Sequence, residues 1–217
     1  ATTEIYTLSL HDALPIFHPD LTFLEAELSK ALRLLLDTFR SGGKLLICGN
    51  GGSSADSEHI VGELMKGFLL KRPLSSDKKD LFTNLFGEDG KQIAEVLQEA
   101  LPAISLSTHT ALSTAFSNDV DPSLAFAQQV LGYANPGDIL LGISTSGNSK
   151  NVCAAAMCAH VCGAKVLALT GQSGGKLASL ADCALTAPET RTFRIQEYHL
   201  AMYHYLCAAV ESECFTQ

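Results

Sequence analysis

The sequence predicts an α/β protein in which a parallel sheet is covered by helices on both faces. Short apolar segments alternate along the chain with longer segments of helical periodicity, and two of the apolar segments run directly into turns rich in glycine and serine. The 217 residues, 47% of them hydrophobic, suffice for one substantial core and leave little for a second. Strands that alternate with helices pair in parallel and bind ligands outside their carboxyl ends.

The first predicted elements are a helix, a strand and a second helix. Apolar residues recur at helical spacing over residues 21–39, and Gly42 and Gly43 supply a stop. Residues 44–48 form a short apolar run, which predicts a buried strand. This strand enters the turn GNGGSS at residues 49–54, and a helix is predicted over residues 55–68.

The remainder of the chain repeats this unit. Four further strands are predicted at residues 103–106, 138–144, 165–170 and 183–187, with helices at 123–133, 150–162 and 193–214. The strand over residues 138–144 opens into a second small-residue turn, STSGNS at 144–149. The closing helix is largely apolar on both sides from Leu200 to Val210, which predicts that more than one sheet face covers it.

The segment between the first unit and the second strand is less regular. Residues 69–102 begin with a polar stretch rich in lysine and serine, and a helix is predicted over residues 91–100. No repeat or domain boundary is visible in it. We expect an excursion over the surface or at the rim of the site.

Residues 1–17 are set apart from the rest of the chain. They have neither an initiator Met nor a helical period, and the run YTLSLHDALPI within them resembles the read-through translation of a sequencing adapter. We expect this segment to be non-native or unstructured, and we leave it out of the functional argument. Residues 18–217 are then predicted to form a single domain.

Charge and cysteine content restrict the partners and the compartment. The formal net charge of −8 argues against a general basic surface for nucleic acid, so an anionic ligand needs a local site. Seven cysteines without a CxxC pair indicate reduced thiols. No apolar run approaches the roughly 20 residues that cross a bilayer. We therefore expect a cytoplasmic protein that binds small molecules and neither nucleic acid nor membrane.

The two turns rich in small residues predict a site for phosphate. Glycine lets backbone amides approach an anion closely, hydroxyl groups add donors, and the helix that follows offers free N–H groups. Either turn alone is also compatible with an ordinary helix cap. Their occurrence at equivalent strand ends favours a phosphate cradle, and neither matches a Walker loop or a dinucleotide fingerprint.

Ionisable residues occur on the helix after the first turn and on the closing helix. His59 and Glu63 are four residues apart and share one helix face, a spacing suited to metal binding or acid–base chemistry, although such a pair is often only a solvated contact. The closing helix contains His199 and His204 in an otherwise apolar segment. Gln196 and His204 would lie about 12 Å apart along a straight helix. Spacing alone does not choose between the two histidines.

Four motifs together resemble a known family. They are CGNGGSSADSEH at residues 48–59, GISTSGNSKNV at 142–152, LTG at 169–171 followed by GGK at 174–176, and IQEYH at 195–199 followed by His204. Their order and spacing resemble those of the phosphoheptose isomerases over residues 21–215. The departures are Ser54 and a longer segment between residues 68 and 106, which puts the substrate more in doubt than the reaction.

The resemblance implies a fold, an assembly and a set of site residues. It implies an SIS (sugar isomerase) domain with a flavodoxin-like five-stranded parallel sheet, zinc as the cofactor, a phosphosugar substrate, and a homotetramer with active sites at subunit interfaces. By residue match the zinc ligands are His59, Glu63, Gln196 and His204. The implied substrate contacts are Asn50, Gly51, Gly52, Ser53, Glu63, Asn118, Asp119, Ser144, Thr145, Ser146, Ser149 and Gln196.

The implied reaction interconverts sedoheptulose 7-phosphate and D-glycero-D-manno-heptose 7-phosphate. It removes a proton from the carbon next to a carbonyl through an enediolate, which needs a base, an acid and stabilisation of the oxygen. Glu63 is the candidate base and His204 the candidate for proton transfer at the other carbon. Because Glu63 cannot be a tight ligand and a free base together, we expect its coordination to change when substrate binds.

Two other functions share many of these features. One is an isomerase of the same fold that acts on a pentose or hexose phosphate, since its phosphate turns would look alike. The other is a non-catalytic SIS module that senses a phosphosugar or binds a partner protein. The presence of His59, Glu63, Gln196 and His204 argues against the second.

Overall fold

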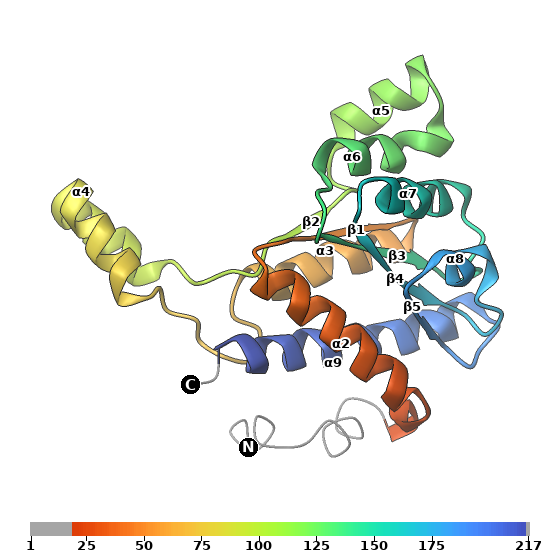
Figure 1. The fold of residues 1–217 in the computed structure, drawn as a ribbon, viewed down its shortest axis with the longest axis horizontal. Helices are drawn as coiled ribbons and strands as arrows, with labels where there is room; N and C mark the ends of the chain where they lie inside the picture. The colour runs from red at the N-terminus through yellow and green to blue at the C-terminus, as the bar shows by residue number, and fades with distance from the viewer. Residues whose placement is uncertain (1–18, 216–217) are drawn as a thin grey trace.

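The computed structural model describes residues 19–215, so the expectation for residues 1–17 lies outside the described part. Its centre is a parallel sheet of five strands in the order β2-β1-β3-β4-β5 (Figure 1). This order is the flavodoxin-like one that was predicted. The strands are β1 (Leu45–Gly49), β2 (Ala103–Ser105), β3 (Ile139–Ser144), β4 (Lys165–Thr170) and β5 (Cys183–Thr186).

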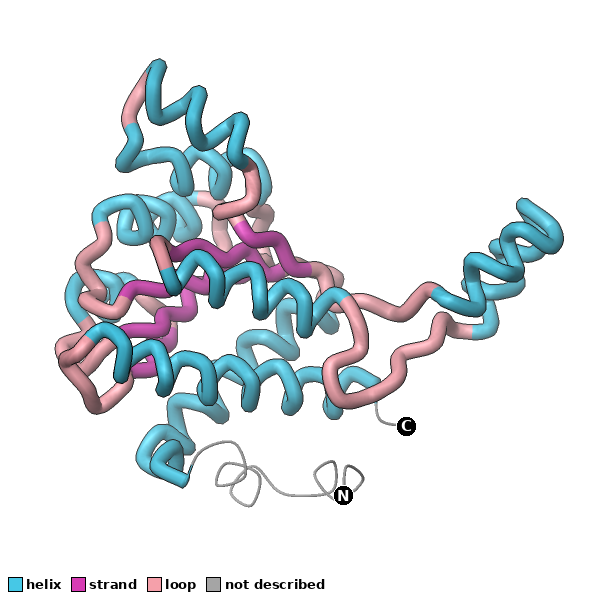
Figure 2. Tube along the Cα trace, turned by 180° about the vertical axis from the view of Figure 1, so that it is seen from behind, coloured by secondary structure: helices cyan, strands magenta, loops and turns pink. Residues whose placement is uncertain are grey.

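Helices cover both faces of this sheet, as Figures 1 and 2 show. One face packs against α2, α3 and α9, and the other against α6, α7 and α8. Alternate residues of β1 divide between the two cores, because successive side chains of a strand point to opposite faces. The helices are η2 (Pro19–Leu24), α2 (Glu25–Arg40), α3 (Gly52–Met65), α4 (Ser76–Val96), α5 (Thr110–Asp119), η3 (Pro122–Leu124), α6 (Ala125–Tyr133), α7 (Lys150–Val161), α8 (Gly175–Leu180) and α9 (Thr192–Phe215).

The cover over α9 agrees with the expectation that more than one sheet face is needed. Most of its apolar residues between Leu200 and Val210 are buried within this chain, because α2 and α3 pack against it as well as the sheet. Leu200, 41% exposed, is an exception. Helices of this chain supply that cover, so the apolar surface of α9 gives no separate support to the expected homotetramer, which stays a prediction.

The predicted bounds of the helix over residues 91–100 were wrong. Helix α4 begins at Ser76, where the Ser75 side chain accepts a hydrogen bond from the Lys78 amide, and it ends at Val96. Gly87, with φ of +62°, breaks it into two pieces and hides the helical period in the sequence. Figures 1 and 2 show α4 projecting away from the body as an arm.

Two short helices had no counterpart in the prediction. Helix α5 has no buried residue and α8 only Leu177, so neither produces a clear apolar period. All seven cysteines are free, as expected. None of the helices within residues 19–215 is both long and apolar enough to cross a membrane.

Candidate active site

The two small-residue turns lie side by side at the carboxyl edge of the sheet. Strands β1 and β3 are neighbours in the middle of the sheet, where the strand order reverses, and each turn follows one of them. The side-chain amides of Asn50 and Asn151 link the turns through two reciprocal hydrogen bonds of 3.0 and 2.9 Å. Open α/β sheets bind ligands at this point of reversal. Both turns therefore border the same region at this edge of the sheet, and the phosphate cradle stays a prediction.

The first turn has little room for side chains. Gly51 has a φ of +56°, which favours glycine, and α3 begins at the next residue with Ser53 buried. A Cβ atom at Gly52 would collide with the side-chain amide of Gln196. Gln196 thus lies against the first turn.

The second turn is held by its own hydroxyl groups. The Ser144 and Ser149 hydroxyls lie 2.9 Å apart, and Ser146 Oγ accepts a hydrogen bond from the Asn148 amide. Gly147 has a φ of +65° and packs against the Gly174 carbonyl so closely that a side chain would not fit. The turn is thus fixed by local contacts, with Ser146 exposed and Thr145 and Ser149 half-buried.

Helices α3 and α9 lie side by side and run in the same direction. Gln196 on α9 meets Gly52 at the beginning of α3, and His204 lies beside His59 further along. Since the first turn leads directly into α3, this pairing places ionisable groups about two to three helical turns from the first turn.

His59, Glu63 and His204 form a cluster between these two helices. His59 Nε2 is 3.1 Å from Glu63 Oε1, and the imidazole rings of His59 and His204 are 5.0 Å apart between centroids and nearly perpendicular. The side chain of Glu63 is 14% exposed and that of His59 is 44% exposed, so the cluster opens to solvent beside His59. The structure brings these three predicted residues together.

Tyr203 and Asp56 support His59 from the other side. The Tyr203 hydroxyl donates to Asp56 Oδ1 at 3.3 Å and lies 2.9 Å from His59 Nδ1. A hydroxyl that donates to Asp56 accepts from His59 in the tautomer that carries the imidazole proton on Nδ1. Neither residue was identified from the sequence. The motif DSEH puts Asp56 one helical turn before His59, and this spacing was the one available signal for Asp56.

Burial changes the acidity of several groups in this region. Burial, and next the positive charge of His59, lower the pKa of His204, while the Glu63 carboxylate opposes them. Burial raises the pKa of Asp56, and the hydrogen bond from Tyr203 offsets part of that effect. The lowered pKa favours the neutral form of His204, which can accept a proton.

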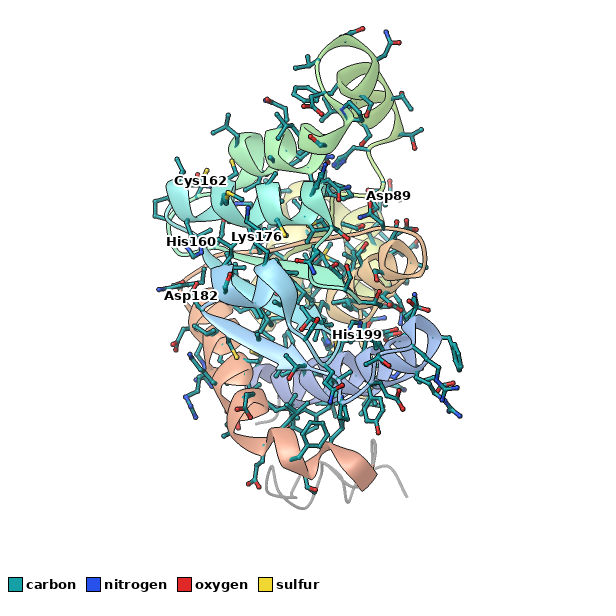
Figure 3. The ribbon with its side chains drawn as sticks, turned by 90° about the vertical axis from the view of Figure 1, so that its right-hand side faces the viewer. Asp89, His160, Cys162, Lys176, Asp182 and His199 are labelled. Atoms are coloured by element: carbon teal, nitrogen blue, oxygen red, sulfur yellow. The ribbon has the colours of Figure 1, made fainter. Side chains whose placement is uncertain are left out.

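The structure separates the roles of the two histidines on α9. His199 is completely buried between α9 and the sheet (Figure 3), with its Nε2 3.1 Å from the Thr170 carbonyl. Burial lowers its pKa to about 4, and its Nδ1 has no hydrogen-bond partner. His199 is a core residue, whereas His204 faces the candidate site.

We expect His199 to make the protein sensitive to acid. Its folded-state pKa of about 4 lies below the usual value of 6.5, so the unfolded chain binds the proton first. This contribution to the free energy of unfolding is complete above pH 6.5. It is lost as the pH falls towards 4, and the loss amounts to about 3 kcal/mol. In His199→Gln, whose amide can still donate to Thr170, the free energy of unfolding should depend less on pH over that window. Denaturant unfolding at several pH values measures it, and equal slopes would contradict it.

Two groups of predicted residues are not joined to this cluster within the chain. Asn118 and Asp119 are exposed at the end of α5, where the Asn118 amide donates to the Asp119 carboxylate, and α5 lies on the opposite side of the sheet from α9 (Figure 1). Gln196 remains at the first turn, away from His204. Their predicted roles in substrate and metal binding stay predictions.

Comparison with known proteins places this fold and site in a class. The model of the SIS domain family matches residues 19–84 and 83–171. The structure of phosphoheptose isomerase from Neisseria gonorrhoeae is similar with a TM-score of 0.70 and 35% identity, covering 87% of each chain. A phosphoheptose isomerase from Francisella tularensis gives the same TM-score at 32% identity, with 85% of each chain covered. The protein is an SIS-domain protein.

Sequence relatives narrow the class to one family. The phosphoheptose isomerase of Helicobacter pylori is 41% identical over 188 residues, which cover 87% of this chain and 84% of the relative. That of a Geobacter species is 39% identical over 199 residues, 90% of each. The chain belongs to the phosphoheptose isomerase family.

Proposed function

We propose that this protein interconverts sedoheptulose 7-phosphate and D-glycero-D-manno-heptose 7-phosphate. The observation that carries the proposal is the cluster of His59, Glu63 and His204 on the helices that also border the paired turns. Family membership supports it, since relatives named phosphoheptose isomerase match most of the chain. An anion cradle next to acid–base groups is what an aldose–ketose isomerase of phosphosugars requires.

The proposed reaction uses the paired turns to hold the phosphate and the cluster to move protons. Backbone amides of the first turn and hydroxyl groups of the second bind the phosphate and so place the sugar carbons near α3 and α9. Glu63 removes the proton next to the carbonyl. His204, whose neutral form is favoured because burial lowers its pKa, takes part in proton transfer at the other carbon.

We also propose zinc as the cofactor, held by His59, Glu63 and His204, with Gln196 as the fourth ligand by family resemblance. In the tautomer of neutral His59 that donates its Nδ1 proton to Tyr203, the lone pair of Nε2 faces a Glu63 oxygen at 3.1 Å. Two such acceptors need a proton or a cation between them. Two imidazoles, a carboxylate and an amide are chemically suited to zinc, although no three His, Cys, Asp or Glu residues within the described chain already form a metal site. When bound, zinc would polarise the sugar oxygens as a Lewis acid.

We propose further that the protein forms a homotetramer with active sites at subunit interfaces. The α4 arm supports an assembly, because Leu81, Leu85 and Phe86 are each more than half exposed and Val96 is 80% exposed. Large apolar side chains that are exposed in a single chain are often covered at protein interfaces. Light scattering at micromolar concentration should give four times the mass of one chain, and a monomer would contradict the proposal.

The function is tested by following phosphosugars with the purified protein by NMR. With sedoheptulose 7-phosphate we expect the aldose heptose phosphate to appear until equilibrium is reached. Turnover of a pentose or hexose phosphate instead would identify another isomerase of this fold. Binding of phosphosugars without turnover of any of them would support a sensor and overturn the proposal.

A further inference from the structure

A buried ion pair lies just beyond the candidate site, where α3 ends. The side chains of Arg72 and Glu211 are both 0% exposed, and Arg72 Nε donates to Glu211 Oε1 at 2.7 Å. Arg72 follows α3 in the connecting segment, and Glu211 lies on α9, two turns beyond His204. Neither residue was identified from the sequence, because the partners are 139 positions apart.

Glu211 fixes the segment that follows α3. Its carboxylate accepts hydrogen bonds from the backbone amides of Phe68, Leu69 and Leu70 at 2.8, 2.7 and 3.0 Å. The ring of Phe68 stacks on the imidazole of His204, with 5.6 Å between centroids. The carboxylate therefore determines the position of an aromatic ring that contacts a candidate catalytic side chain.

Arg72 fixes the end of α3 itself. Its two terminal nitrogens donate to the Leu64 carbonyl at 2.7 Å and to the Glu63 carbonyl at 3.2 Å. These carbonyls are among those that a helix leaves without a partner in its last turn, and a cation there also complements the helix dipole. The guanidinium holds the backbone of Glu63, the candidate base.

The Arg72–Glu211 ion pair thus contacts the backbone of one candidate catalytic residue and the segment that packs against the other. A buried ion pair contributes little net stability, since desolvation of the two charges offsets their attraction, and its attested value is to specify one arrangement. Here the arrangement includes the backbone of Glu63 on α3 and the ring beside His204 on α9.

We propose that Arg72 and Glu211 are positioning residues that hold Glu63 and His204 at the relative positions needed for proton transfer. This inference rests on the proposed function. Neither residue contacts the paired turns that would bind the phosphate, so their loss should affect turnover more than substrate binding. A displacement of about 1 Å in a catalytic group can cost as much as 10²-fold in rate.

Glu211→Gln tests this, with Asp138→Asn as the matched control. Asp138 is also a buried carboxylate that accepts from two backbone amides, those of Lys44 and Asn135, and from a cation, the Lys44 ammonium. It precedes β3, at the opposite end of the sheet from the turns. Both variants should unfold at lower denaturant concentration. Only Glu211→Gln should lower kcat, by about 10-fold to 100-fold, with KM nearly unchanged.

A second readout does not depend on turnover. The ring resonances of His204 in NMR spectra should shift in Glu211→Gln and stay in place in Asp138→Asn. Unchanged resonances, or an equal fall in kcat in both variants, would overturn the inference. If the wild type turns over no phosphosugar, the proposed function fails, but the resonances still decide whether the pair positions His204.

A second variant serves if Glu211→Gln does not fold. Phe68→Leu removes the ring beside His204 and leaves the ion pair in place. Wild-type kcat and wild-type His204 resonances in that variant would overturn the inference.

Discussion

Replacing Glu63 by glutamine should slow the turnover of sedoheptulose 7-phosphate by roughly 10²–10⁴-fold, the usual effect of losing a general acid–base group. Glutamine keeps the size of the side chain and an oxygen atom but cannot accept the proton. Binding of the phosphosugar should persist, because the paired turns that would hold the phosphate are unchanged. The direct measurement is exchange of the carbon-bound proton of the substrate with deuterated solvent, followed by NMR.

Glu58→Gln is the matched control for this experiment. Glu58 lies on the same helix, is exposed, and makes no contact within the His59 cluster that the structure describes. It should exchange the proton at the wild-type rate. Equal exchange in wild type and Glu63→Gln would remove Glu63 from the mechanism, and no exchange in any of the proteins would favour a sensor.

The sheet and its two turns could be predicted because their signals are local. The strands β1 and β3 are buried at every position and so appear in the sequence as uninterrupted apolar runs. Their glycines and serines follow at once, and parallel pairing brings the turns to one edge. His59 and Glu63 could be predicted as a pair, since four residues of a helix bring them to one face.

The choice between His199 and His204 could not be made from the sequence. Helix α9 is buried around much of its circumference, so its apolar pattern does not show which side faces the site. Tyr203, Arg72 and Glu211 were missed for a related reason. Their importance comes from contacts with residues far away in the chain, and no local pattern signals such contacts.

The segment that contains α4 shows a second reason why prediction from the sequence failed. The position of α4 was mispredicted because Gly87 interrupts it and most of its apolar side chains do not face a core of this chain. A period can be detected only where one helix face is buried. The same exposed side chains that obscured the helix now support the proposed assembly.

Removing zinc should abolish turnover, with recovery on adding the metal back. The physical reason is that the sugar oxygens lose the Lewis acid that would polarise them. Elemental analysis should find one zinc per chain in the active protein. Zinc should also raise the melting temperature of the metal-free protein, since a ligand that binds the folded state alone stabilises it.

His59→Asn and His160→Asn separate the proposed zinc site from adventitious binding. His160 is an exposed histidine on α7 whose Nε2 lies 2.6 Å from the Leu180 carbonyl, on the other side of the sheet from α9. His160→Asn should retain both the zinc and its thermal effect, whereas His59→Asn should lose both, because it removes an imidazole ligand and the partner of Tyr203. Full activity in metal-free protein would exclude zinc from the reaction. Zinc retained equally by both variants would place the ion elsewhere in the protein.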